Sequence, residues 1–310
     1  MKFALVFPGQ GSQSLGMMAA YGDSAVVRQT FDQASAALGR DLWQLASAGP
    51  AEAINQTVNT QPLMLTAAIA VYRLWCEAGG PQPALVAGHS LGEYSALVAA
   101  GVLDFVDAVP LVELRARAMQ EAVPAGTGAM AAILGLDAAA VEAACAEAAQ
   151  GEVVEAVNFN APEQIVIAGN AAAVERAAAA CKARGAKRAV MLPVSAPFHC
   201  KLMLPAAEKL RERLAQVDFK TPVIPVVNNV DALCLDQPEA IKEALVRQAA
   251  APVRWVAGMR FMAAADVAQV VECGPGRVLS ALAKRCAEGL SGLAMDNLDG
   301  LKAALAAVKA

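Results

Sequence analysis

The sequence predicts an α/β fold in which helices cover both faces of a parallel sheet, and a second, smaller domain interrupts the chain. Three observations predict it. Short apolar runs alternate with helical stretches on both sides of a central segment. Residues 126–195 follow a different order of elements. The length of 310 residues exceeds that of a typical single domain and leaves room for two.

The large domain is expected to comprise residues 1–125 and 196–310. The first strand spans 2–7 and leads into a loop rich in Gly and Gln at 8–13. Helical stretches begin near Gly16 and near Val27, an apolar helix follows over 61–79, and a buried strand covers 84–88. After residue 196, the pattern predicts helices over 205–216 and 240–248 and strands over 223–228 and 267–273.

The small domain is expected at residues 126–195. Its strands are predicted at 130–135, 153–158, 164–168 and 186–192, and its helices at 138–150 and 171–184. The resulting β-α-β-β-α-β order is that of the ferredoxin-like motif. Segments rich in Pro and Gly at 124–128 and 193–197 are suitable hinges. We therefore interpret this segment as an insertion into the large domain.

Composition excludes several classes of protein. A content of 57% hydrophobic and 17% charged residues favours a folded, helix-rich chain over a disordered one. No apolar run approaches the roughly 18 residues of a membrane span, and the apolar N-terminus is too short for a signal peptide. The net charge of −4 disfavours nucleic acid as a partner. Seven widely spaced cysteines without a C-x-x-C pair indicate reduced thiols in a cytoplasm and make a metal site improbable.

Ser90 is the candidate nucleophile. It lies at the centre of Gly88-His89-Ser90-Leu91-Gly92, between a buried strand and a second apolar run of helical character. This is the G-x-S-x-G elbow, a sharp strand-to-helix turn that presents the serine Oγ above a hydrolase-like sheet. The strand before the motif and the helix after it carry as much weight as the five letters themselves.

His199 is the candidate general base. A serine hydroxyl needs a base within hydrogen-bond distance, and the chain has only two histidines. His89 adjoins Ser90 on a turn whose neighbouring side chains diverge, so we expect it to pack or to form a hydrogen bond at the elbow. This leaves His199, which follows a predicted strand. Its neighbour Cys200 is expected to be packed.

Four segments in order resemble malonyl-CoA:acyl carrier protein transacylases, which are acyltransferases of bacterial fatty-acid synthesis. They are residues 7–13 (FPGQGSQ), 88–94 (GHSLGEY), 196–199 (APFH) and 272–276 (ECGPG), and they are spread over nearly the whole length of the chain. The resemblance implies transfer of a malonyl group from malonyl-CoA to the phosphopantetheine thiol of acyl carrier protein. The transfer would be ping-pong, through a malonyl ester on Ser90, in the cytoplasm and without a cofactor beyond the CoA thioester substrate.

The resemblance also assigns roles around the serine. The main-chain N–H groups of Gln10 and Leu91 would stabilise the negative oxygen that forms when a thioester carbonyl is attacked. The helix that starts at the elbow would favour that charge as well. Arg115, in an apolar helical stretch, would hold the free carboxylate of the malonyl group through two parallel hydrogen bonds.

Three further site residues follow from the same resemblance. The main-chain carbonyl of Gln248 would accept a hydrogen bond from His199, in place of the carboxylate of an esterase triad. Asn160 would face the acyl pocket from the small domain, and the bulk of Phe198 would leave little room for a 2-methyl branch. A cationic group near the end of the small domain could meet CoA phosphates or the acidic carrier protein: Lys182, Arg184, Lys187 and Arg188.

Three alternatives remain open from the sequence. A serine thioesterase or hydrolase has the same elbow and base, with water as the acyl acceptor. A stand-alone polyketide acyltransferase would differ only in its acyl or carrier preference. A non-catalytic binding protein could use the same scaffold, although both the nucleophile and the base are present.

Overall fold

The computed structural model describes residues 1–309 and contains two sheets. The larger is parallel throughout, in the order β7-β2-β1-β8-β9. Its strands are β1 (Phe3–Phe7), β2 (Leu85–Gly88), β7 (Val226–Val227), β8 (Gln269–Glu272) and β9 (Ser291–Ala294). Every residue of β1, β2 and β8 is buried, as expected for strands covered on both faces.

Alternate residues of β1 belong to different cores. Leu5 and Phe7 join a large cluster with α1 (Ala25–Leu38), α4 (Thr57–Glu77), α5 (Gly92–Ala99), α6 (Phe105–Glu121), α9 (Leu204–Leu214) and α10 (Pro238–Ala249). Ala4 and Val6 point the other way, toward α11 (Trp255–Ala264) and α12 (Val278–Cys286). Three further helices contribute residues to the same cluster as Leu5 and Phe7: α2 (Leu42–Ala48), α3 (Ala51–Ile54) and the C-terminal α13 (Leu298–Lys309).

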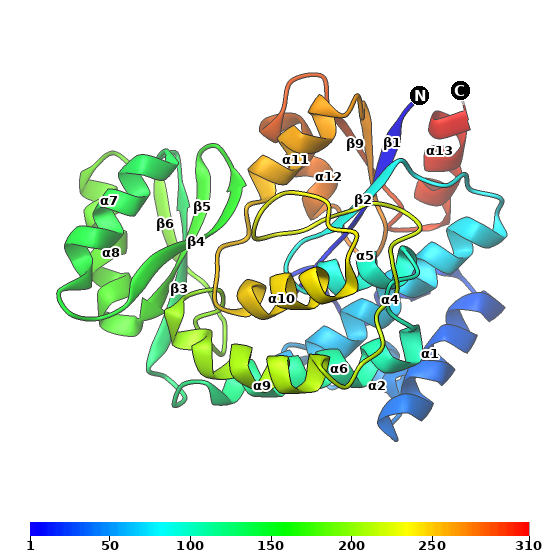
Figure 1. Cartoon of the computed structure of the whole chain (residues 1–310), viewed down its shortest axis with the longest axis horizontal. Helices are drawn as coiled ribbons and strands as arrows, with labels where there is room; N and C mark the ends of the chain where they lie inside the picture. Colours follow the sequence, from blue (N-terminus) through cyan, green and yellow to red (C-terminus); the bar gives the residue numbers. More distant parts are fainter. Residues whose placement is uncertain (310) are drawn as a thin grey trace.

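The smaller sheet is antiparallel, in the order β4-β5-β3-β6. Its elements are β3 (Gly128–Leu134), α7 (Ala138–Ala149), β4 (Val154–Ala161), β5 (Gln164–Asn170), α8 (Ala171–Ala183) and β6 (Arg188–Met191). Helices α7 and α8 cover the outer face (Figure 1). The other face packs on Phe198 and Cys200, so the small sheet contacts the segment that carries His199.

A short bridge joins the small sheet to the chain that follows α10. Edge strand β4 pairs with Val253, whose N–H donates to Val157 O at 2.8 Å and whose carbonyl accepts from Phe159 N at 3.0 Å. The bridge lies only a few residues after Gln248, so the segment that contacts His199 is also attached to the small sheet.

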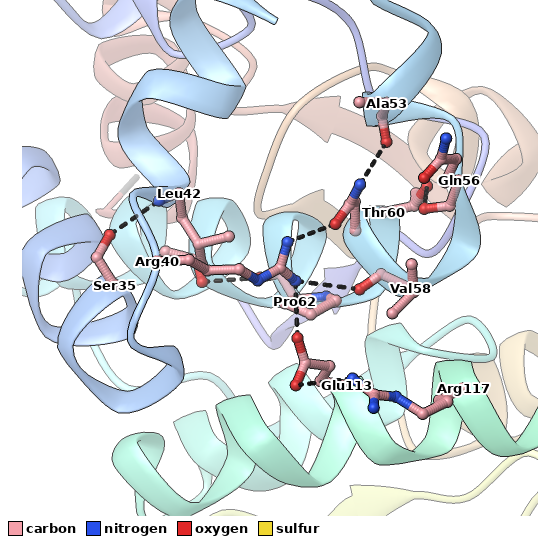
Figure 2. A network of polar contacts seen from close by, with 12 residues as sticks. Ser35, Arg40, Leu42, Ala53, Gln56, Val58, Thr60, Pro62, Glu113 and Arg117 are labelled. Carbon is pink, nitrogen blue, oxygen red and sulfur yellow. Dashed lines mark hydrogen bonds and ion pairs between the residues drawn. The ribbon is translucent and has the colours of Figure 1, made fainter. Parts of the chain in front are cut away.

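Arg40, in the loop between α1 and α2, joins helices α4 and α6 (Figure 2). Its guanidinium donates to Asn59 Oδ1 and Val58 O at the start of α4, and to Glu113 Oε1 on α6 at 2.9 Å. Glu113 also lies 3.8 Å from Arg117, one turn further along α6. These contacts set the packing of α4 against α6, the helices that carry Gln61 and Arg115.

Several predicted boundaries differ from the structure. The helix expected near Gly16 is a series of turns with one 3-10 turn at Ala19–Tyr21. The strand expected over 223–228 shrinks to Val226–Val227, because Pro222 and Pro225 lack the N–H that pairing requires. Elements α2, α3, α11, α12, β9 and α13 were not predicted. Within residues 1–309, none of the helices has the length and apolar character that a membrane crossing requires.

Candidate active site

The elbow at Ser90 has two positions, Gly88 and Gly92, where there is room for a hydrogen but not for a Cβ atom. Ser90 has φ 53°, a left-handed conformation that costs a non-glycine residue about 1–3 kcal/mol. A Cβ on Gly88 would lie 1.8 Å from the backbone of Gly92, and one on Gly92 would lie 2.0 Å from Phe7 O. The spacing of the motif therefore follows from the close approach of the elbow to itself and to β1.

Asn229, a residue that sequence reasoning missed, holds the elbow in its strained conformation. Its Oδ1 accepts from Ser90 N at 2.7 Å, and its Nδ2 donates to Gly88 O at 2.7 Å. Its own backbone N–H donates to Glu93 Oε2 at 3.0 Å. The buried amide thus satisfies two backbone groups of the elbow, the carbonyl of Gly88 and the N–H of Ser90.

Ser90, His199 and Gln248 form a hydrogen-bonded series. His199 Nε2 lies 2.7 Å from Ser90 Oγ, and Nδ1 lies 2.8 Å from the main-chain O of Gln248. A carbonyl can only accept, so the hydrogen resides on Nδ1 and the lone pair of Nε2 faces the hydroxyl. Like Ser90, His199 has a left-handed backbone, with φ 66°. The geometry suits proton transfer from Ser90 to His199.

The imidazole is held in its neutral form. Burial lowers the pKa of His199 to about 3, and the positive charge of Arg115 acts in the same direction. A protonated imidazole has no lone pair to accept a hydroxyl proton. The depressed pKa therefore keeps the Nε2 lone pair of His199 available to the Ser90 hydroxyl at neutral pH.

Arg115 lies in the same site with its guanidinium almost completely buried. One terminal nitrogen donates to Gln61 Oε1 at 2.7 Å, and the other donates to Gln248 Oε1 at 2.9 Å. The second nitrogen is also 3.4 Å from Ser90 Oγ. The nitrogen that donates to Gln61 keeps one hydrogen without a protein acceptor, and the other nitrogen directs its second hydrogen at Ser90 Oγ in a long contact that a ligand oxygen beside the serine can replace. That pair matches the two oxygens of a carboxylate.

Gln10 and Leu91 supply amide groups next to the hydroxyl. Both residues line the cavity that contains Ser90, and neither N–H donates to a protein acceptor within residues 1–309. The loop approaches so closely that a Cβ on Gly9 would lie 2.5 Å from His89 O. Thr57 anchors the loop, because its hydroxyl donates to Gln10 Oε1 at 2.9 Å. Two unpartnered amides beside a nucleophile can stabilise a developing oxyanion.

The cavity has a volume of about 130 Å³ and lies between the two sheets. Polar groups occupy its floor, and apolar side chains from the small sheet and the segment before His199 form its walls: Met130, Leu192, Val194 and Phe198. A second cavity of about 210 Å³ adjoins it and shares Gln10, His89, Asn158 and Leu192. Phe198 therefore lines the same cavity as Ser90, and its role in limiting the size of an acyl group stays a prediction.

Asn160 and His89 contact each other rather than the serine. Asn160 lines the second cavity, and its Oδ1 lies 2.7 Å from His89 Nε2. The His89 ring packs on Trp255, with the ring centroids 5.3 Å apart. This pair joins the elbow to β4. The role in acyl binding that the sequence suggested for Asn160 stays a prediction.

The predicted cationic group is partly engaged in local contacts. Arg184 pairs with Glu147 at 2.5 Å, and the stem of Lys187 packs over Gly135. Arg188 is exposed on edge strand β6. Its contact with CoA or a carrier protein also stays a prediction.

An α/β core that presents a serine hydroxyl to an oriented, neutral imidazole, with free amides and a buried arginine around it, has the arrangement of enzymes that act through an acyl-serine. The chain belongs to the acyl transferase domain family, whose model matches residues 4–302. The resemblance found in the sequence is thereby confirmed, and so is the expectation of a parallel α/β core with a smaller sheet.

Named relatives cover almost the whole chain. The chain is 58% identical over 305 residues to the malonyl CoA-acyl carrier protein transacylase of Escherichia coli K12, covering 98% of this chain and 99% of the relative. It is 60% identical to the acyl-carrier-protein S-malonyltransferase of Burkholderia pseudomallei 1710b, whose crystal structure superposes with a TM-score of 0.97 over 99% of this chain and 100% of that one. A malonyl-transacylase solved in complex with a type II PKS acyl-carrier protein is 55% identical, with a TM-score of 0.98 over 99% and 100%.

Three polar residues of the site that the sequence analysis did not identify share one feature that could have revealed them. Gln61, Glu93 and Asn229 are buried, and each lies in or beside an otherwise apolar run. A polar side chain at a buried position needs a partner, so its presence in such a run indicates a buried polar network.

Proposed function

We propose that the protein transfers malonyl groups from malonyl-CoA to the phosphopantetheine thiol of acyl carrier protein, and so supplies fatty-acid biosynthesis. The observation that carries the proposal is that two Arg115 N–H groups, one without a protein acceptor and one in only a 3.4 Å contact with Ser90 Oγ, lie in the cavity that contains the serine. A carboxylate one methylene away from a thioester carbonyl fits that pairing. The names of the relatives at 58% and 60% identity support the same substrate and acceptor.

In the first half of the reaction, His199 Nε2 takes the proton of Ser90 as Oγ attacks the thioester carbonyl. The N–H groups of Gln10 and Leu91 stabilise the oxyanion of the tetrahedral intermediate. Collapse of that intermediate breaks the carbon–sulfur bond. The imidazolium returns its proton to the departing CoA sulfur, and a malonyl ester remains on Ser90.

The second half runs in reverse with a different thiol. The carrier's phosphopantetheine thiol enters through the second cavity, gives its proton to His199 and attacks the ester carbonyl. Ser90 leaves and recovers the proton. Both halves use only this chain's own groups and the thioester, so we propose that no cofactor takes part.

Three residues complete the proposed acyl site. Gln248 O holds the Nδ1 hydrogen of His199 and so fixes the tautomer that the reaction needs. Phe198 limits branching at the carbon next to the carbonyl. Asn160 lines the approach to the serine from the small domain.

We also propose that residues 126–195 form a ferredoxin-like domain inserted between 1–125 and 196–310. The β-α-β-β-α-β chain order and the antiparallel sheet support this division. A cytoplasmic location is proposed because every cysteine is a free thiol.

Mass spectrometry of the intact protein tests the covalent scheme. After mixing with malonyl-CoA, the wild type should gain one malonyl group, and Ser90→Ala should gain none. Addition of carrier protein should then remove the adduct and produce malonyl-carrier. Absence of a wild-type adduct rejects the scheme, and release of free malonate at the same rate with and without carrier would indicate a hydrolase.

A polyketide carrier is the second candidate acceptor. The relative at 55% identity, solved with a type II PKS acyl-carrier protein, favours it. Transfer rates to purified fatty-acid and polyketide carriers, measured from the same malonyl-enzyme, separate the two.

A further inference from the structure

The groups that hold Arg115 are all uncharged. Within the described chain, its guanidinium donates to the side-chain carbonyls of Gln61 and Gln248 and approaches Ser90 Oγ. Below its plane lies the ring of Tyr94, 5.4 Å from the guanidinium carbon. A buried arginine is ordinarily paired with a carboxylate, because an isolated buried charge is costly. Here the positive charge has no direct ionic partner.

A carboxylate does lie nearby, but one side chain further away. Glu93 is 2% exposed in the first turn of α5, and its Oε2 accepts from Gln248 Nε2 at 2.9 Å. Gln248 thus uses its amide in both directions, with the carbonyl toward Arg115 and the amino group toward Glu93. The same amino group donates to Ser90 O at 2.9 Å, which fixes the orientation of the amide.

This separation has a consequence for binding. A carboxylate in place of either glutamine amide would accept from the same Arg115 hydrogens but would also cancel the charge that attracts a substrate carboxylate. A glutamine orients the guanidinium without that effect. Above its pKa of about 7, the Glu93 carboxylate behind Gln248 offsets part of the cost of burying the cation, because Coulomb attraction persists over that distance in a medium of low dielectric constant.

We propose that Gln61 and Gln248 determine selectivity for acyl groups that carry a carboxylate, because they orient Arg115 without pairing its charge, while the nearest carboxylate, Glu93, stays behind Gln248. Both glutamines are positioning residues that act through Arg115. The inference rests on the proposed malonyl transfer and goes beyond the roles of Ser90, His199 and the Gln248 main chain.

Relocating one charge tests the proposal. The double variant Glu93→Gln/Gln248→Glu keeps the net charge but moves the carboxylate into contact with Arg115. Its main-chain carbonyl still faces His199, so the support of the base is kept. At about pH 8, above the Glu93 pKa of about 7, enzyme is mixed with malonyl-CoA and an excess of acetyl-CoA, and the ratio of malonyl to acetyl adducts on Ser90 is read by mass spectrometry. This ratio reports relative kcat/KM and is insensitive to losses shared by both acyl groups.

We expect the malonyl to acetyl ratio of the double variant to fall by about tenfold or more, corresponding to about 1.4 kcal/mol or more. Glu93→Gln alone keeps a neutral acceptor for Gln248 and Asn229, so its ratio should equal or exceed that of the wild type. Gln61→Glu brings a carboxylate to Arg115 from a different helix and should lower the ratio as the double variant does. It serves as the second test if the double variant does not fold, as judged by thermal unfolding.

Glu243→Gln is the matched control. It removes one carboxylate from the outer side of α10, where Glu243 pairs with Arg211, and should leave the ratio at the wild-type value. A double variant or a Gln61→Glu variant that folds, forms adducts and keeps the ratio within twofold of the wild type overturns the inference. A wild type that forms no malonyl adduct, or does not prefer malonyl over acetyl, instead rejects the proposed function itself.

Discussion

Replacement of Arg115 by methionine removes the guanidinium and keeps a side chain of similar length in the same helix. The wild-type side chain is 2% exposed, and its terminal nitrogens have two hydrogens for a ligand, one without a protein acceptor and one in a 3.4 Å contact with Ser90 Oγ. The malonyl carboxylate would use both. The acetyl group has no carboxylate, so it gains nothing from the charge. The substitution should therefore affect the two acyl groups very differently.

The size of the difference follows from the two hydrogen bonds. A hydrogen bond to a charged group contributes about 1.5–3 kcal/mol, so two of them contribute about 3–6 kcal/mol. At about 1.4 kcal/mol per factor of ten, kcat/KM for malonyl-CoA should fall by about 10² to 10⁴. Loss of the Arg115 charge also raises the pKa of His199, because that charge is one of the causes that lower it.

The assay is steady-state transfer to carrier protein from each CoA thioester, with the acyl-enzyme quantified in parallel. Circular dichroism and thermal unfolding establish that the variant is folded. A loss of kcat/KM for acetyl-CoA equal to that for malonyl-CoA would refute the reasoning, since it would mean that Arg115 supports the site without contacting the acyl carboxylate.

Three further predictions concern neighbouring groups. The pKa of His199 is about 3, so kcat/KM for malonyl-CoA should stay within twofold between about pH 7.5 and 5.5. A tenfold fall in kcat/KM per pH unit below about 6.5 would contradict a neutral, buried imidazole. Asn229→Ala removes the acceptor of Ser90 N and the donor to Gly88 O, so urea unfolding should show that the free energy of unfolding falls by about 2–3 kcal/mol. The variant should also have a lower kcat. An unchanged free energy of unfolding would contradict the role of Asn229 in holding the elbow. Burial raises the pKa of Glu93 to about 7 from 4.5, so this carboxyl stabilises the fold below its unfolded pKa and the stabilisation is lost as pH rises through 7. Compared with Glu93→Gln, the wild type should lose about 3 kcal/mol of unfolding free energy between about pH 4.5 and 8, and parallel pH profiles of the two proteins would argue against a protonated carboxyl in the fold.

The strongest sequence signals were those set by local geometry. The elbow was predicted because the turn itself requires Gly88 and Gly92, and the contacts that a Cβ would make there explain the requirement. The β-α-β-β-α-β order was also readable, because each of its strands and helices is long enough to show its own period.

The remaining features depend on contacts between segments far apart in the chain. Asn229 lies in a loop that reads as an ordinary turn, and its importance comes from bonds to Ser90 and Gly88, 139 and 141 residues away. The side chain of Gln248 likewise read as an ordinary helix end, although it contacts Arg115, Ser90 and Glu93. Strand β9 was missed because it has only four residues and none of them is buried, so it shows no apolar run.

The two backbone hydrogen bonds between Val253 and β4 have a mechanical consequence. Any rotation of the small sheet away from the large one would pull on the stretch of chain that also supports the imidazole. Opening the acyl chamber in that way would disturb the proton acceptor at the moment of substrate entry. The position of the small sheet and the orientation of the imidazole are therefore coupled through Val253.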